Sequence, residues 1–277
     1  MDLYREEAGA GVPILLIHPA GATASTWGSV IEGLAGAGRV LAYDRRGYAR
    51  SGGQLVRSIS THTADAARLL EHMDAGPAVV VGTSAGAAIA VDLAVRRPEL
   101  VRAVVAHEFP WRFTRQVPSA SQVTSLTKMA WLSLVGRVDD AAETLLRSAY
   151  AYRDGGSAWD AFPQEWRRIG REHARPALAD FLSSIRSYPS APDLARVAVP
   201  VVCSYGARSP DAMFRLVRRL ADAIPTARVQ RIEGSGHAAP FDAPTHFVQL
   251  VAGALASTAG PSLRRAPAPL PAGRGGG

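Results

Sequence analysis

The sequence predicts an α/β fold, a mostly parallel β-sheet flanked by helices with an inserted helical cap. Short runs rich in Val and Ile recur along the chain, and longer segments with helical spacing lie between them. This alternation is typical of folds in which helices cover both faces of a parallel sheet. A single interval of about 90 residues lacks any strand-like run, and it predicts the cap.

The predicted elements follow one another in a regular order. The strand-like runs are Val12–Ile17, Arg39–Tyr43, Ala78–Val81, Val101–Ala106, Val199–Tyr205 and Ala227–Ile232. The helical segments outside the cap are Ser25–Ala37, Thr61–Ala75, Ser84–Arg97, Asp211–Ala223 and Pro244–Ser257. Before the first run only Leu3–Glu6 resembles a strand. We therefore expect the first strand to be shortened or missing, and an exposed edge there to favour a homo-oligomer.

The long interval between the fourth and fifth runs exceeds the usual length of a loop. Its helical patterns are Ser121–Val135, Ala141–Tyr152, Ala158–Glu172 and Ala177–Ser187. We predict an α/β core at residues 1–108 and 197–258, with the helical cap at 109–196. Residues 259–277 are rich in Ala, Gly, Pro and Arg, so we expect a disordered tail there.

Composition argues against several classes of partner. The net charge is +7, but the arginines are not clustered with aromatic residues, so we expect no nucleic-acid partner. Cys203 is the one cysteine, which excludes an intramolecular disulfide. No segment resembles a signal peptide or a membrane span, and no His, Asp and Glu cluster has metal-ligand spacing. We expect a cytoplasmic protein with no membrane partner, no metal and no cofactor.

The pentapeptide Gly82–Gly86 carries the sharpest chemical signal. It follows the apolar run Ala78–Val81 and opens a helix of small residues. A serine in a G-x-S-x-G turn between a strand and a helix is exposed above the sheet, and the glycines give the tight turn its room. We predict that Ser84 is a catalytic nucleophile.

A nucleophilic serine needs a base, and His237 follows the last strand-like run in the segment Gly234–His237. The carboxyl end of a strand is where an α/β sheet places its catalytic groups. The chain order, serine before histidine, also fits a serine hydrolase. We predict that His237 is the general base.

Four motifs in this order and spacing resemble the α/β-hydrolase superfamily over about residues 3–258. They are His18–Gly21 with Trp27 after it, Asp44–Gly52, the turn around Ser84, and His237. The resemblance implies the α/β-hydrolase fold and an oxyanion hole made of two backbone N–H groups. It assigns these to Ala20 and Ala85. Pro19 has no N–H to donate, so Gly21 is the fallback donor.

The catalytic acid has two candidates. Many members of the superfamily carry it three residues after the glycine that ends the penultimate strand. That glycine is Gly206 here, but the third residue is Ser209 and the nearest acid is Asp211. Glu108, just after the run Val101–Ala106, is the alternative, since some members carry the acid there. A buried acid without a role would be costly, so we favour Glu108.

A narrower resemblance links the chain to zearalenone hydrolases, which are lactonases of resorcylic lactones. It rests on His107–Pro110 and on Gly155–Trp159 in the cap. The resemblance implies a triad of Ser84, His237 and Glu108, and opening of a macrolactone whose freed acid then loses carbon dioxide.

The predicted function is hydrolysis of a small apolar carboxylic ester or lactone, such as zearalenone, through an acyl-enzyme. Substrate contacts are expected from Trp159, Trp111 and Tyr188, although aromatic residues at helical spacing can equally form the core of the cap. The alternatives are another carboxylesterase, a carbon–carbon hydrolase, or a ligand receptor with slow turnover on the same fold.

Overall fold

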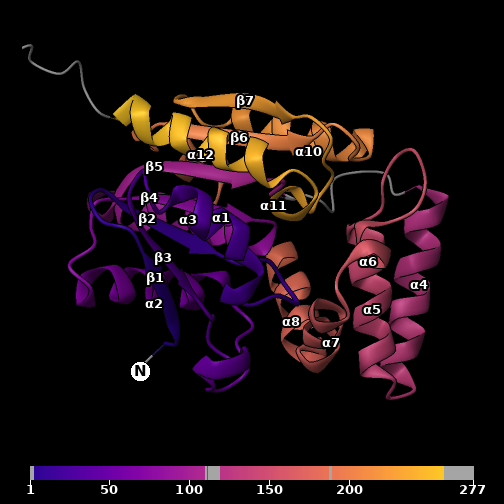
Figure 1. The fold of residues 1–277 in the computed structure, drawn as a ribbon. Helices are drawn as coiled ribbons and strands as arrows, with labels where there is room; N and C mark the ends of the chain where they lie inside the picture. The colour runs from indigo at the N-terminus through magenta and orange to yellow at the C-terminus, as the bar shows by residue number, and fades with distance from the viewer. Residues whose placement is uncertain (1–2, 110, 112–118, 187–188, 259–277) are drawn as a thin grey trace, which may run out of the picture.

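The computed structural model describes residues 3–109, 111, 119–186 and 189–258 (Figure 1). Its strands form one sheet in the order β1-β3-β2-β4-β5-β6-β7. They are β1 (Arg5–Ala8), β2 (Pro13–Ile17), β3 (Arg39–Tyr43), β4 (Ala78–Thr83), β5 (Val101–His107), β6 (Val201–Gly206) and β7 (Ala227–Ile232). All neighbouring pairs are parallel except β1 and β3. The predicted fold class is confirmed.

Helices cover both faces of the sheet (Figure 1). Outside the interval between β5 and β6 they are α1 (Gly28–Leu34), α2 (Ile59–His72), α3 (Ala85–Arg96), α10 (Asp211–Asp222), α11 (Ala239–Asp242) and α12 (Pro244–Thr258). Short 3₁₀ turns are η1 (Ala24–Trp27), η2 (Ala49–Ser51) and η3 (Pro98–Leu100). Successive strand residues face opposite sides. Leu15 therefore belongs to the buried cluster that includes residues of α2, α3 and α10, whereas Leu16 belongs to the cluster that includes residues of α1 and α12.

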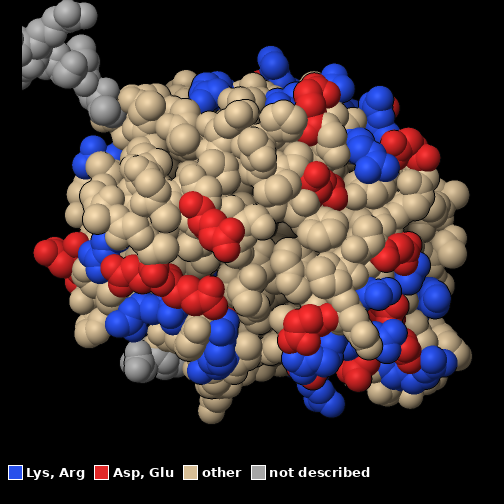
Figure 2. Space-filling model, viewed as in Figure 1, with Lys and Arg blue, Asp and Glu red and all other residues tan. Residues whose placement is uncertain are grey.

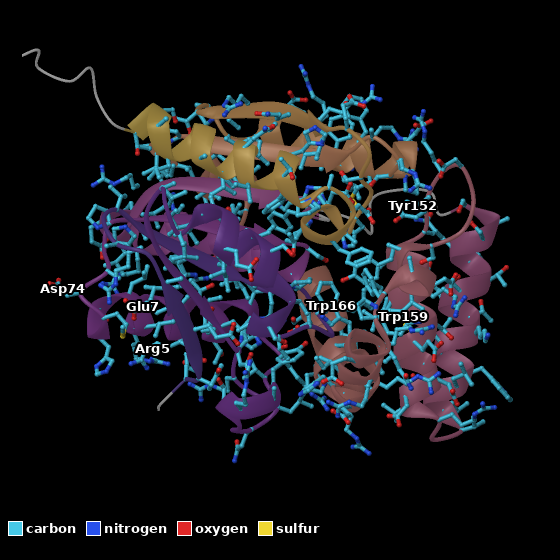
Figure 3. The ribbon with its side chains drawn as sticks, in the orientation of Figure 1. Arg5, Glu7, Asp74, Tyr152, Trp159 and Trp166 are labelled. Carbon is cyan, nitrogen blue, oxygen red and sulfur yellow. The ribbon has the colours of Figure 1, made fainter. Side chains whose placement is uncertain are left out.

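The first strand is present, as the edge strand β1. It pairs antiparallel with β3 and begins two residues later than the segment Leu3–Glu6 that the sequence indicates. Charged side chains lie along this edge, where Glu7 pairs with Arg39 at 2.5 Å and Glu6 pairs with Arg50 at 3.2 Å (Figure 3). Such charges disfavour pairing with a second sheet. The edge therefore lends no support to the predicted self-association.

The described chain between β5 and β6 consists mainly of helices, with one isolated β-bridge between Ala151 and Ser157. Its helices are α4 (Ala120–Leu134), α5 (Val138–Ala149), α6 (Ala158–Ala161), α7 (Gln164–Glu172), α8 (Ala174–Arg186) and α9 (Ala191–Leu194). All of them fall within residues 109–196, the range predicted for the cap. The helix expected over Ala158–Glu172 is two helices, because Pro163 forces Phe162 into an extended conformation.

Aromatic residues join this helical insertion to the α/β core. Tyr150, Trp159 and Phe162 pack together with Ala238, which directly follows His237. Trp159 and Trp166 lie between the insertion and the core in Figure 3. The insertion therefore covers the loop that carries the predicted base. The division into two domains remains a prediction, and the predicted tail lies outside the described residues.

Acidic and basic side chains are interspersed on the face shown in Figure 2. Several arginines are paired with nearby acids, as Arg168 is with Glu165 at 2.5 Å. No single basic patch stands out on this face. Among the described helices, none has the length and apolar character needed to cross a membrane.

Candidate active site

Ser84 occupies a strained turn between β4 and α3. Its backbone angles are φ 51° and ψ −116°, in the region of positive φ that non-glycine residues seldom adopt. Its N–H donates a hydrogen bond to the carbonyl of His107, at 2.9 Å. Strain of this kind persists where the surrounding structure enforces it, and it gathers at functional sites.

Gly82 and Gly86 give this turn its room. A Cβ atom on Gly82 would lie 2.2 Å from the carbonyl oxygen of Gly86. A Cβ atom on Gly86 would lie 2.1 Å from the carbonyl oxygen of Ile17, at the end of the neighbouring strand β2. Only glycine fits at both positions, as the sequence pattern predicts.

Glu108 and His237 are joined directly. Nδ1 of His237 lies 2.7 Å from Oε2 of Glu108, which is fully buried just beyond the end of β5. The other carboxylate oxygen accepts hydrogen bonds from the N–H of Gly206, at 2.9 Å, and from the hydroxyl of Ser209. Burial alone would raise the pKa of Glu108, but the hydrogen bond from His237, the two nearby imidazoles and the hydroxyl of Ser209 together lower that pKa.

The ionised carboxylate accepts a hydrogen bond from the N–H at Nδ1 and so fixes the tautomer of His237. Nε2 is then free of its proton and can act as a base. Ser84 and His237 line one cavity, although the described contacts include no hydrogen bond between their side chains. Catalytic hydrogen bonds of unliganded enzymes often form only with substrate.

Asp211 lies away from this arrangement. Its side chain is 79% exposed at the start of α10, and its nearest cation is Arg153, at 3.7 Å. Ser209, the third residue after Gly206, donates its hydroxyl to Glu108. The position at which the sequence analysis looked for a catalytic acid therefore holds a supporting hydrogen-bond donor.

The buried His107 and the half-buried Asp242 hold the loop that carries His237. The ring of His107 lies between the hydroxyl of Ser204, at 3.1 Å, and the carbonyl of Gly236, at 3.2 Å. Asp242 accepts a hydrogen bond from the N–H of Gly236, at 2.8 Å. Because Gly236 directly precedes His237, both contacts orient the imidazole. The sequence analysis predicted neither contact: His107 appears there only within the His107–Pro110 segment, and no motif marks Asp242.

Both predicted oxyanion donors border the cavity that contains Ser84. Ala85 is the first residue of α3, where backbone N–H groups have no acceptor within the helix. The cavity is lined by Pro19, Ala20, Ser84, Ala85, Leu145, Leu146, Ala149, Tyr150, Asp180, Phe181 and His237. The amide of Gly21 instead faces the hydroxyl of Tyr48. This contact leaves Ala20 as the better placed donor of the two.

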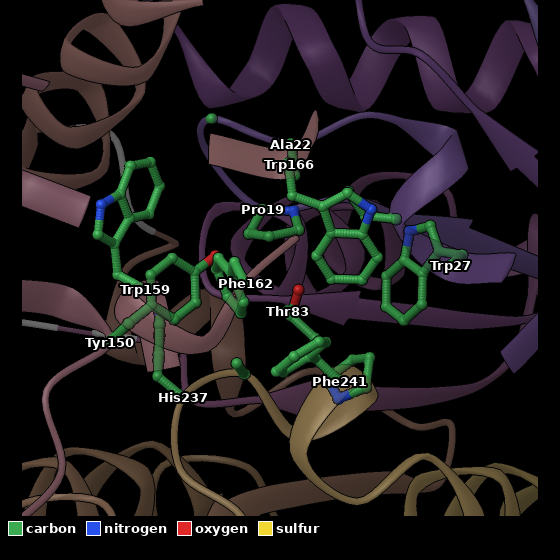
Figure 4. Close-up of a pocket in the computed structure, with 14 residues that line it drawn as sticks. Pro19, Ala22, Trp27, Thr83, Tyr150, Trp159, Phe162, Trp166, His237 and Phe241 are labelled. Atoms are coloured by element: carbon green, nitrogen blue, oxygen red, sulfur yellow. The ribbon is translucent and has the colours of Figure 1, made fainter. Parts of the chain in front are cut away.

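A second cavity adjoins the first and is strongly aromatic (Figure 4). Pro19, Tyr150 and His237 line both. The remaining lining residues are Gly21, Ala22, Thr26, Trp27, Thr83, Trp159, Phe162, Trp166, Ala238, Pro240 and Phe241. The rings of Tyr150 and His237 are 5.4 Å apart between centroids. An apolar, flat group could therefore lie beside the imidazole.

The three aromatic residues predicted to contact substrate differ in where the structure places them. Trp159 lines the aromatic cavity. The expectation for Trp111 is corrected: it lines neither cavity and packs in the main core, with its indole N–H bonded to the carbonyl of Pro189. A buried tryptophan needs such an acceptor. Tyr188 lies outside the described residues.

The site also contains aromatic residues that the sequence analysis missed, Tyr150 and Phe241. Tyr150 belongs to an ordinary helical pattern and Phe241 lies between the predicted elements, so no motif marks either residue as part of the site. In the described part of the chain, no group of three or more His, Cys, Asp or Glu side chains could hold a metal ion.

Comparisons with known proteins add to this geometry. Residues 14–249 match the Alpha/beta hydrolase family. YraK of Bacillus subtilis, named a hydrolase, is 39% identical over 112 residues, which cover 39% of this chain and 41% of YraK. BpoC of Mycobacterium tuberculosis is 28% identical over 249 residues, which cover 88% of this chain and 94% of BpoC. The match to YraK thus spans less than half of that relative.

Two crystal structures illustrate the shared fold. BpoC has a TM-score of 0.72 and 26% identity, and covers 93% of this chain and 97% of BpoC. An enol-lactonase from Burkholderia xenovorans also has a TM-score of 0.72, with 21% identity and coverage of 92% and 96%. At 21% identity, the likeness to the enol-lactonase shows a shared fold and nothing more.

The Ser84 turn gives a prediction about stability. Gly86→Ala should lower the free energy of unfolding by about 1–3 kcal/mol or more, because the new Cβ meets backbone rather than a movable side chain. Gly253→Ala in α12 is the matched control, since nothing lies within 4 Å of its added Cβ. Urea denaturation of both variants checks this, and equal stability of the two would contradict it.

The buried His107 predicts acid sensitivity. Burial lowers its pKa to about 4, whereas an unfolded histidine titrates near 6.5. Between these values the unfolded state binds more protons, so stability falls as the pH drops from about 6.5 to 4. The slope for one such histidine is about 1.4 kcal/mol per pH unit.

The quantity to compare between variants is the slope of the free energy of unfolding against pH between about pH 4 and 6.5, rather than the free energy itself. His107→Gln should flatten the dependence of the free energy of unfolding on pH, whereas His246→Gln, at an exposed position, should leave it unchanged. An unaltered slope in His107→Gln would show that His107 is not kept neutral by the fold.

Proposed function

The chain belongs to the α/β-hydrolase family, and on that premise we propose that it is a serine hydrolase that cleaves a carboxylic ester or lactone. The hydrogen bond between Glu108 and His237 is the observation that carries the proposal, because it prepares an imidazole beside the cavity of Ser84. A serine on a strained turn, a base and an ionised acid together are the parts of a covalent hydrolytic mechanism.

The reaction begins with attack of the Ser84 hydroxyl oxygen on the substrate carbonyl carbon. Nε2 of His237 takes the hydroxyl proton, and Glu108 stabilises the imidazolium that forms. The developing oxyanion accepts hydrogen bonds from the amides of Ala20 and Ala85. The N-terminus of α3 also points at this charge and favours it.

Collapse of the tetrahedral intermediate breaks the bond to the alcohol, and His237 returns its proton to the leaving oxygen. In a lactone this alcohol remains attached to the acyl chain. Water, activated by His237, then attacks the acyl-enzyme and releases the acid with regeneration of Ser84. These steps need no group beyond the side chains and backbone amides described above.

The substrate that suits the two cavities is apolar and contains a ring. Tyr150, Trp159, Phe162, Trp166 and Phe241 surround the aromatic cavity, where a planar ring would find contact on its faces and edges (Figure 4). Resorcylic macrolactones such as zearalenone belong to this class. The resemblance of the segments His107–Pro110 and Gly155–Trp159 to zearalenone hydrolases supports this narrower candidate.

Consumption of zearalenone, followed by mass spectrometry, tests substrate and nucleophile together. We expect wild type to form the hydrolysed, decarboxylated product and Ser84→Ala to lose about 10⁶-fold in kcat, as other serine enzymes do without their nucleophile. Retained turnover in the folded Ser84→Ala variant would remove the assignment. If wild type does not turn over zearalenone, rates measured on a panel of aryl esters and small lactones identify the substrate class.

The acid is tested by two conservative substitutions. Glu108→Gln should lower kcat by about 10³- to 10⁴-fold, because the amide no longer fixes the tautomer or neutralises the imidazolium. Asp211→Asn should leave kcat close to wild type, since its side chain is exposed and distant from His237. Steady-state kinetics on an activated ester measures both, and the opposite ranking would transfer the role to Asp211.

A further inference from the structure

A fully buried ion pair connects the helical insertion to the core beside the cavity of Ser84. Asp180 belongs to α8, and Arg45 follows β3. Their side chains are 1% and 0% exposed, and Nη2 of Arg45 lies 2.5 Å from Oδ2 of Asp180. Asp180 lines the same cavity as Ser84. This pair is therefore close to the chemistry without belonging to the proposed triad.

The carboxylate of Asp180 also contacts two other side chains of the core, Tyr48 and His62. The hydroxyl of Tyr48 donates to Oδ2 at 2.5 Å, and Nε2 of His62 lies 3.5 Å from Oδ1. On Arg45, Nε and Nη1 are buried without a hydrogen-bond partner, so Asp180 is the main group that compensates its charge. Burial opposes ionisation of Asp180, but its interactions with Arg45 and His62 together outweigh burial and hold the pKa of Asp180 well below the usual range.

Arg45 and Tyr48 in turn hold the loop that carries Ala20. The backbone N–H of Arg45 donates to Nε2 of His18 at 3.0 Å, and its guanidinium donates to the carbonyl of Pro19 at 3.2 Å. The hydroxyl of Tyr48 faces the amide of Gly21. Ala20, the proposed oxyanion donor, is thus fixed from both sides by the two residues that Asp180 binds.

A second residue of the insertion reaches the same place. The ring of His173 stacks on Tyr48, with 5.4 Å between centroids and an angle of 19° between the planes. Its Nε2 accepts a hydrogen bond from the N–H of Ala49 at 2.7 Å. Two residues of the insertion, Asp180 and His173, therefore both contact the Arg45–Ala49 segment.

A stabilising role alone explains this pair poorly. Removing two charges from water is costly, and an apolar pair of similar volume is often equally stable or more so. What an ion pair adds is fixed geometry, since each oxygen and N–H accepts only certain partners. Oxyanion donors need such precision, because a small displacement from the reacting atoms costs a large factor in rate.

We propose that Asp180 is a positioning residue that couples the helical insertion to the oxyanion hole by holding Arg45 and Tyr48 against the His18–Gly21 loop. This inference rests on the proposed function, because it assigns the amide of Ala20 to the oxyanion. Asp180 itself touches no reacting atom in this scheme. Its removal slows the chemical step more than it weakens substrate binding.

Asp180→Asn tests the coupling, with Asp65→Asn as its control. Asp65 is also buried and pairs with the next arginine, Arg46, but it contacts nothing in the His18–Gly21 loop. With p-nitrophenyl acetate we expect Asp180→Asn to lower kcat by about 10- to 100-fold with KM near wild type. Asp65→Asn should preserve both constants.

Hydrogen exchange measured by mass spectrometry reports the protection of the backbone amides in the His18–Gly21 loop, independently of catalytic activity. Peptides that cover residues 18–24 should exchange faster in Asp180→Asn than in wild type or Asp65→Asn. Unchanged exchange together with unchanged kcat would overturn the proposal. Loss of kcat without faster exchange at 18–24 would also overturn it, because the effect would then not act through the loop.

Two further measurements separate the possible failures. If a fluorophosphonate fails to label Ser84 in wild type, the proposed function fails, while the exchange data still decide whether Asp180 holds the loop. If Asp180→Asn does not fold, the double variant Arg45→Met with Asp180→Leu replaces the pair by apolar side chains. A folded double variant should show the same loss of kcat, and full activity in it would overturn the coupling.

Discussion

The buried carboxylate of Glu108 is the interaction on which the site depends. A buried charge persists only when it is compensated and its oxygens accept hydrogen bonds. Glu108 meets this demand with His237, Gly206 and Ser209. These partners lie at the ends of β6 and β7, so one carboxylate at the end of β5 ties together three neighbouring strand ends. The fourth strand in this row, β4, carries Ser84.

The helical insertion completes the site in two distinct ways. Its aromatic residues Tyr150, Trp159 and Phe162 form an apolar wall beside His237, where a ring-containing substrate would lose contact with water. Its charged residue Asp180 contacts the core through Arg45 and Tyr48. Substrate shape and the geometry of the oxyanion hole therefore both depend on how this insertion packs.

Much of the core followed from local patterns. Buried parallel strands read as apolar runs, and the observed β3 and β7 have the bounds that the runs indicate. The glycines around Ser84 were informative because their spacing reflects backbone contacts within one turn. The roles of aromatic residues in the insertion were harder to predict. Trp111 and Trp159 were both predicted to contact substrate, yet Trp111 packs in the core and Trp159 lines a cavity.

By itself the sequence determined the fold class, the Ser84 turn and the position of His237 after a strand, because these features are encoded by neighbouring residues. It narrowed the acid to Glu108 or Asp211, and the tertiary structure placed only Glu108 against His237. Tertiary structure alone brought Asp180 to Arg45, His107 to Gly236, and Tyr150 to His237. Those pairs are distant in sequence, so their contacts arise only from packing of complete elements.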